Sequence, residues 1–189
     1  MNLPNKLTML RVFLIPVFVF FMFTTLVPGN FFFALAVFII ASLTDMLDGM
    51  IARKRNLVTN FGKFMDPLAD KLLVISALIC LLVIEDGARL CPNRVLAAVA
   101  IMVIVAREFV ISGFRLVASD AGIVIAASMW GKVKTATTMV AICVLIAAGD
   151  LSFLKIPGYV LFWVSVLLTV VSLVDYLRKN IGVIKDGKK

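Results

Sequence analysis

The chain has 189 residues, of which 62% are hydrophobic, with a mean hydropathy of +1.10 and a formal net charge of +8. This composition excludes an ordinary soluble domain and is typical of an integral membrane protein. The basic residues are spread along the chain instead of forming one tail. The positive charge therefore indicates a membrane surface as the partner, and no nucleic acid.

Six apolar runs predict an all-α, polytopic protein with six transmembrane helices. Several runs are shorter than the ~20 residues that a spanning helix needs, so polar residues must continue those helices at one end. The first run lacks a signal-peptide cleavage site and is predicted to be a retained helix. The runs cover residues 12–27, 31–43, 72–84, 95–106, 133–148 and 157–174.

The segment before the first run, residues 2–11, is predicted to form a short interfacial helix. Asn5, Thr8 and Arg11 recur at every third position in it. This polar line could face a cavity in the protein or the lipid headgroups, and the sequence favours neither.

Four aspartates lie where the second and third runs approach each other. Asp45 and Asp48 are three residues apart and Asp66 and Asp70 four, so each pair shares one face of its helix. A short turn would make the two helices an antiparallel hairpin. Carboxylates at a membrane edge are costly without a cation, and a chain without histidine favours Mg²⁺ or Mn²⁺. We predict two such ions, as in phosphoryl-transfer sites.

Small and basic residues adjoin these aspartates. Gly49, Ala52 and Gly62 would let a phosphorylated ligand approach the backbone, although small residues also serve helix packing in membranes. Arg53 could bind phosphate or belong to the basic cytoplasmic surface. Since no serine or cysteine has a histidine partner, a carboxylate is the evident general base, and we assign that role to Asp70.

A second group of cations follows the fourth run and begins the fifth. Arg107 and Arg115 are eight residues apart, and Lys132 and Lys134 come later. They could bind an anionic alcohol substrate, since arginine grips phosphate with two hydrogen bonds, or they could only orient the protein in the membrane. Glu108 is expected to pair with one of the arginines.

The distribution of basic residues predicts the orientation. All but three of the 19 lysines and arginines fall on the side that holds both termini and the even-numbered connections. Both termini and the aspartates should therefore be cytoplasmic. We divide the chain into a membrane domain, residues 1–177, and a basic, disordered cytoplasmic tail, residues 178–189, that contacts anionic lipid.

The aspartate string resembles the signature of the CDP-alcohol phosphatidyltransferases at every fixed position. The matching residues are Asp45, Asp48, Gly49, Ala52, Arg53, Gly62, Asp66 and Asp70. The resemblance implies a six-helix membrane fold, usually homodimeric, in which the aspartates bind two divalent cations. It also implies that the CDP moiety docks near Gly49, Ala52, Arg53 and Gly62, that Asp70 is the base and that CMP leaves.

Flanking segments resemble the bacterial phosphatidylglycerophosphate synthases, one branch of that family. They include Pro4-Asn-x-Leu-Thr-x-x-Arg11, Asp66-Pro-x-Ala-Asp-Lys71, Ala106-Arg-Glu108 with Ser112 and Arg115, and Gly131-Lys-x-Lys-Thr135. This branch implies CDP-diacylglycerol as donor, glycerol 3-phosphate as acceptor and the bacterial inner membrane as location. Serine or inositol phosphate is the alternative acceptor. A cation transporter is disfavoured because the aspartates lie at one interface, not near the bilayer midplane.

Overall fold

The computed structural model describes residues 3–55, 60–84, 93–120, 125 and 128–185, with the side chains of a smaller set. Within these residues every regular element is a helix, which confirms the all-α prediction. The elements are α1 (Leu3–Phe23), α2 (Asn30–Arg55), α3 (Asn60–Val83), α4 (Arg94–Asp120), α5 (Met129–Ala147), the short 3₁₀ helix η1 (Ser152–Leu154) and α6 (Lys155–Lys185).

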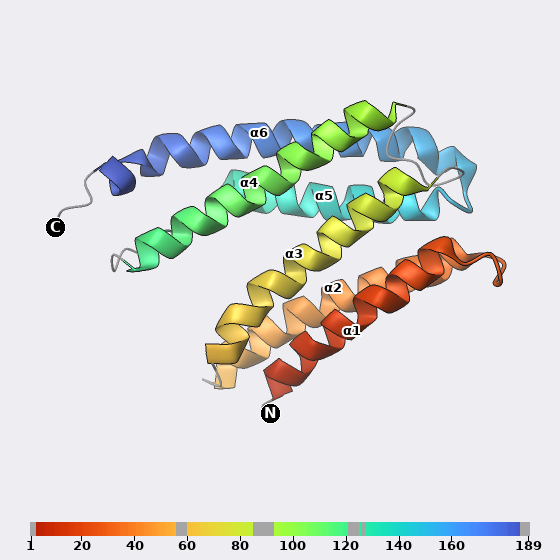
Figure 1. Cartoon of the computed structure of the whole chain (residues 1–189), viewed down its shortest axis with the longest axis horizontal. Helices are drawn as coiled ribbons and strands as arrows, with labels where there is room; N and C mark the ends of the chain where they lie inside the picture. Colours follow the sequence, from red (N-terminus) through yellow and green to blue (C-terminus); the bar gives the residue numbers. More distant parts are fainter. Residues whose placement is uncertain (1–2, 56–59, 85–92, 121–124, 126–127, 186–189) are drawn as a thin grey trace.

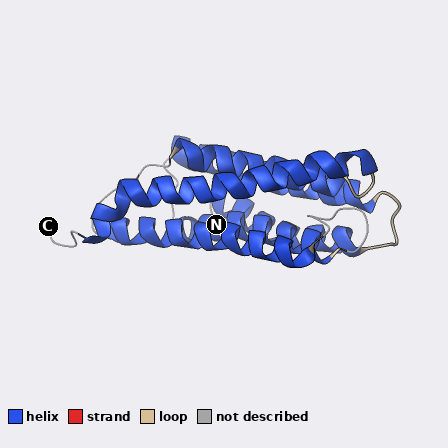
Figure 2. Ribbon diagram, turned by 90° about the horizontal axis from the view of Figure 1, so that it is seen from above, coloured by secondary structure: helices blue, strands red, loops and turns tan. Residues whose placement is uncertain are grey.

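The helices are roughly aligned and lie in stacked layers (Figures 1 and 2). α1 packs against α2 and α3, α6 packs against α4 and α5, and α3 and α5 contact each other and link the two groups. The start of α1 and the end of α6 lie at one end of the molecule, together with the ends of α2 and α4 and the starts of α3 and α5 (Figure 1). This arrangement agrees with the parity deduced from the basic residues.

Three described helices are long and apolar enough to cross a membrane: Arg94–Ser119, Met129–Ala147 and Ser152–Asn180. The apolar parts of the other three are shorter: Leu7–Phe23, Asn30–Thr44 and Lys71–Val83. In α2 and α3 the helix continues through the polar aspartate segments, as predicted. Six spans remain a prediction for the complete chain.

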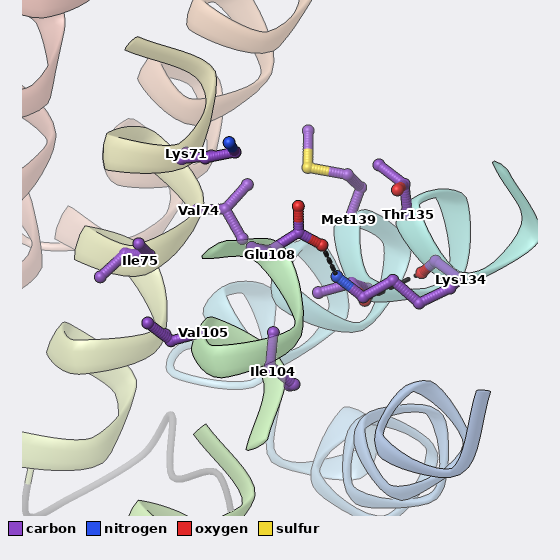
Figure 3. Close-up of a pocket in the computed structure, with 10 residues that line it drawn as sticks. Lys71, Val74, Ile75, Ile104, Val105, Glu108, Lys134, Thr135 and Met139 are labelled. Atoms are coloured by element: carbon purple, nitrogen blue, oxygen red, sulfur yellow. Dashed lines mark hydrogen bonds and ion pairs between the residues drawn. The ribbon is translucent and has the colours of Figure 1, made fainter. Parts of the chain in front are cut away.

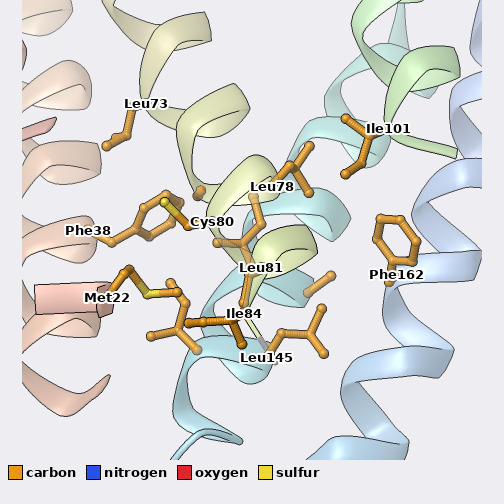
Figure 4. Close-up of a cluster of buried hydrophobic side chains, with 14 of the residues drawn as sticks. Met22, Phe38, Leu73, Leu78, Cys80, Leu81, Ile84, Ile101, Leu145 and Phe162 are labelled. Carbon is orange, nitrogen blue, oxygen red and sulfur yellow. The ribbon is translucent and has the colours of Figure 1, made fainter. Parts of the chain in front are cut away.

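A buried apolar cluster joins all six α-helices (Figure 4). Phe18 and Phe38 connect α1 to α2 with ring centroids 5.8 Å apart. Alanines such as Ala41 and Ala77 are fully buried and let the helices approach closely. Large apolar side chains cover much of the outer surface, which suits a chain whose helices are surrounded by lipid.

Two sequence predictions about the chain ends need correction. Residues 3–11, predicted as a short helix that leads into the first apolar run, are helical and form the first turns of α1. Thr8 and Arg11 are fully buried, so the alternative that they face lipid headgroups is wrong. At the other end, α6 continues through Lys185, so most of the tail predicted as disordered is helical.

At the end of the molecule away from the aspartates, polar contacts fix the start of α2 against neighbouring segments. Asp150 Oδ2 accepts a hydrogen bond from the backbone N–H of Phe32 at 3.2 Å, and Asn30 Nδ2 donates to the carbonyl of Phe21 at 3.0 Å. Gly29 has a φ of 70°, which favours glycine, and makes the turn between α1 and α2. These contacts have a structural role, as expected for the connectors at this end.

Packing of α5 on α6 yields a first prediction. A Cβ added at Gly158 would lie 2.7 Å from Leu145 Cδ2 and 2.9 Å from Leu145 Cγ, whereas one added at Gly113 meets nothing within 4 Å. Leu145 is fully buried and has little room to move. We expect Gly158→Ala to destabilise the fold by about 1–3 kcal/mol in a denaturation titration in detergent.

Gly113→Ala is the matched control, because it makes the same change in an open part of a helix. It should be neutral or stabilising by up to about 1 kcal/mol through helix propensity. Equal effects of the two substitutions would show that α5 and α6 do not pack as tightly as described.

Candidate active site

The ends of α2 and α3 that carry the aspartates form an antiparallel hairpin. The backbone is helical over residues 45–55 and 60–70, and these helix ends lie together at one end of the molecule (Figure 1). The predicted hairpin is thereby confirmed. The side chains predicted to bind the metal and the CDP moiety lie outside the part whose side chains are described: Asp45, Asp48, Gly49, Ala52, Arg53, Gly62, Asp66 and Asp70.

A cavity lies beside this hairpin, between α3, α4 and α5 (Figure 3). Its volume of about 50 Å³ is several times the ~10–15 Å³ that one water requires. One part of the wall is apolar and the rest polar, as in a site that orients a small polar group. The lining residues are Lys71, Val74, Ile75, Ile104, Val105, Glu108, Lys134, Thr135, Thr138 and Met139.

Glu108 is the centre of an ionic network at this cavity. Its Oε1 accepts hydrogen bonds from Lys134 Nζ at 2.6 Å and from Arg107 Nη1 at 2.9 Å. Lys134 is only 2% exposed and Arg107 only 7%. Cations this deeply buried need a counter-charge, and Glu108 supplies it to both. The prediction that Glu108 pairs with an arginine is confirmed, and the pairing with Lys134 is an addition to it.

Arg107 also joins α4 to α6. Its Nη2 donates a hydrogen bond to Ser172 Oγ at 2.5 Å. A Cβ added at Gly131, at the start of α5, would lie 3.1 Å from that nitrogen. Gly131 therefore lets the guanidinium fit between α5 and α6, and Ser172 and Glu108 fix its direction.

The start of α5 determines where its two lysines point. Ser128 is extended, with φ −70° and ψ 151°, and its Oγ accepts from the backbone N–H of Gly131 at 3.1 Å, so it caps the helix. Positions two apart on a helix lie about 200° apart around the axis. Lys134 consequently points inward to the cavity, whereas Lys132 is exposed.

The four cations predicted for the acceptor thus occupy three different environments. Lys134 lines the cavity, and Arg107 lies behind Glu108. Arg115, in the last turns of α4, and Lys132, in the first turn of α5, are exposed. The first two form one network, and the last two are available at the surface.

Two residues of this region had no role in the sequence-based site. Lys71, which follows Asp70, lines the cavity and donates a hydrogen bond to Ser112 Oγ on α4. The second residue is Ser172, which lies within an apolar run. A signal was present: Ser165, Thr169 and Ser172 recur at four- and three-residue spacing, and all are fully buried. Small polar residues on one helix face indicate helix–helix contact in a membrane.

Comparison with known proteins agrees with this geometry. The sequence model of the CDP-alcohol phosphatidyltransferase family matches residues 1–171. Similar proteins named CDP-diacylglycerol–glycerol-3-phosphate 3-phosphatidyltransferase occur in Bacillus subtilis strain 168, at 42% identity over 98% of each chain, and in Pseudomonas fluorescens, at 38% over 100% of this chain and 95% of the relative. An Arabidopsis thaliana protein with that name and the suffix 2 is 40% identical over 94% of this chain and 79% of its own. The chain belongs to the CDP-alcohol phosphatidyltransferase family.

Proposed function

We propose that this protein transfers the phosphatidyl group from CDP-diacylglycerol to glycerol 3-phosphate, giving phosphatidylglycerol phosphate and CMP. The observation that carries the proposal is the cavity beside the aspartate helices, which the buried cation Lys134 lines. The name shared by relatives that match almost the whole chain supports the same donor and acceptor.

We further assign the metal site to Asp45, Asp48, Asp66 and Asp70, with two Mg²⁺ or Mn²⁺ ions as cofactors. The hairpin of α2 and α3 supports this assignment, since it brings together the helix ends that carry all four carboxylates. An all-oxygen donor set in a chain without histidine fits hard divalent cations. When bound, the ions neutralise the diphosphate of the donor and polarise its phosphorus.

Other residues bind the two substrates and accept the proton. Gly49, Ala52, Arg53 and Gly62 hold the CDP moiety. Asp70 accepts the proton of the attacking acceptor hydroxyl. The acceptor phosphate is held by the cations of α4 and α5, namely Arg107, Arg115, Lys132 and Lys134. Glu108 keeps the Lys134 ammonium at the cavity wall through their 2.6 Å contact.

We place the protein in the bacterial inner membrane as a multi-pass homodimer with both termini and the active site in the cytoplasm. This orientation is supported by the start of α1 and the end of α6, which lie at the same end of the molecule as the ends of α2 and α4 (Figure 1). The last turns of α6 and the basic residues after them would then lie at the anionic inner leaflet.

The test is CMP release by the purified protein in detergent with CDP-diacylglycerol and Mg²⁺. Glycerol 3-phosphate, serine and inositol phosphate are compared as acceptors, and EDTA removes the metal. We expect release with glycerol 3-phosphate and none after EDTA. Release with another acceptor alone would change the proposed substrate, and no release with any acceptor would overturn the proposed reaction.

The acceptor role of α5 gives a further prediction. Replacing both Lys132 and Lys134 by alanine should raise the KM for glycerol 3-phosphate by about 10–100-fold, as expected for the loss of charge-assisted hydrogen bonds to phosphate. The KM for CDP-diacylglycerol should change little. Lys155→Ala, at the opposite end of the molecule, is the control for removing positive charge. An unchanged acceptor KM would leave these lysines only a role in membrane orientation.

A further inference from the structure

Lys71 is a cation at the cavity that the proposed site does not use. It lies on α3, whereas the proposed acceptor cations lie on α4 and α5 or their ends. It lines the same cavity as Glu108 and Lys134. Figure 3 shows Lys71 and Lys134 approaching from opposite sides, with Glu108 between them. The cavity therefore has an ammonium group on each of two facing helices.

The direction of Lys71 is set by a neighbouring helix. Its Nζ donates a hydrogen bond to Ser112 Oγ, and Ser112 lies on α4, one turn beyond Glu108. A serine hydroxyl is neutral, so this bond holds the ammonium without cancelling its charge. Lys134 differs in this respect, because it is paired with the carboxylate of Glu108. Among the described residues that line the cavity, Lys71 is consequently the cation whose hydrogen-bond partner is neutral.

The charge of the network shows what Lys71 adds. Among the described residues at the cavity, Lys134, Arg107 and Glu108 together have a net charge of plus one, and Lys71 raises it to plus two. A phosphate monoester carries about −1.5 to −2 at neutral pH. Lys71 adds one positive charge to this network, and a dianionic phosphate is attracted to it more strongly than a neutral alcohol is. A zwitterionic acceptor such as serine has no net charge and gains less from this added cation.

Lys71 also lies at nearly the same height along α3 as the proposed base, Asp70. It follows Asp70 directly, so the two α-carbons differ by about 1.5 Å along the helix axis and about 100° around it. An acceptor phosphate held at Lys71 would keep a short acceptor close to the α3 end that carries Asp70. The same contact would disfavour alcohols that lack the phosphate.

We propose that Lys71 binds the phosphate of the acceptor from α3 and makes the site selective for a phosphomonoester alcohol. This inference rests on the proposed function, because it assigns a specificity residue to that same site. Ser112 acts as a positioning residue for Lys71. The group recognised is a dianionic phosphate on the Lys71 side of the cavity, with the Lys134 ammonium held by Glu108 on the other side.

Kinetics of two matched variants test the proposal. Lys71→Met and Ser112→Ala both remove the α3–α4 hydrogen bond, but only Lys71→Met removes the charge. We expect Lys71→Met to raise the KM for glycerol 3-phosphate by about 10–100-fold with the KM for CDP-diacylglycerol unchanged, and Ser112→Ala to raise it about threefold. Lys71→Arg should recover at least part of the loss. Equal KM values in Lys71→Met and Ser112→Ala would overturn the proposal, since they would assign the effect to the lost helix contact.

A comparison with glycerol tests selectivity directly. Glycerol has the same reacting hydroxyl and no phosphate. The preference of the wild type for glycerol 3-phosphate over glycerol, expressed as kcat/KM, should fall by about 10–100-fold in Lys71→Met. An unchanged preference would contradict the inference. If the wild-type protein released no CMP with glycerol 3-phosphate, the proposed function would fail instead, so the two failures are distinguishable.

A binding measurement makes the test independent of turnover. The measurement is made in EDTA, which removes the metal and so any phosphate bound to it. Inorganic phosphate should then raise the melting temperature of the wild-type protein in detergent. Sodium chloride at equal ionic strength is the control. The shift should be retained in Ser112→Ala and largely lost in Lys71→Met. A full shift in Lys71→Met would overturn the proposal.

Discussion

Replacing Asp70 by asparagine is expected to lower the turnover number by about 10²–10⁴-fold, the usual contribution of a general acid or base. The acceptor hydroxyl must lose its proton as it attacks phosphorus, and an amide cannot accept that proton. The chain has no histidine to take over this role. CMP release at saturating concentrations of both substrates measures the effect.

Binding separates the chemical role of Asp70 from a role in folding. Binding of CDP with Mg²⁺, followed by calorimetry, should remain measurable in Asp70→Asn. Asp150→Asn is the matched carboxylate control, because Asp150 lies in the connection at the opposite end and accepts from the N–H of Phe32, which an asparagine oxygen can also do. Turnover within tenfold of the wild type in Asp70→Asn would remove Asp70 as the base.

The helices and their common end could be predicted because each depends on a local pattern. Runs of apolar residues and the bias of lysine and arginine to one side are properties of single segments. The burial of Arg11 and Thr8 could not be predicted in this way. It depends on how α1 packs against α2 and α3, and a polar line at three-residue spacing is equally compatible with headgroups.

The ionic network shows a similar limit at the site. The sequence predicted a partner for Glu108, since an unpaired carboxylate in an apolar helix is costly. The choice of Lys134 over Lys132 follows from where α5 begins, which the Ser128 cap fixes. The hydrogen bond from Arg107 to Ser172 joins residues 65 positions apart and depends on the relative rotation of α4 and α6. Such a contact has no local signature.

Replacing Glu108 by glutamine should lower the free energy of unfolding by about 3 kcal/mol, because breaking a buried ion pair leaves its partner without a counter-charge. Two cations contact this one carboxylate oxygen, Lys134 at 2.6 Å and Arg107 at 2.9 Å. The Glu108 side chain is 24% exposed, so water screens only a small part of the interaction. A denaturation titration of the protein in detergent measures the loss.

Asp175→Asn provides the matched comparison on α6. Asp175 pairs with Lys179 at 2.7 Å, but the Lys179 side chain is 64% exposed, so losing this pair should change stability by less than about 1 kcal/mol. Adding Lys134→Met to Glu108→Gln should recover part of the lost stability, because it removes one of the buried charges that Glu108 had compensated. Similar small losses in Glu108→Gln and Asp175→Asn would mean that the cavity network is screened like a surface pair. The cations of α4 and α5 would then be held by helix packing instead of by Glu108.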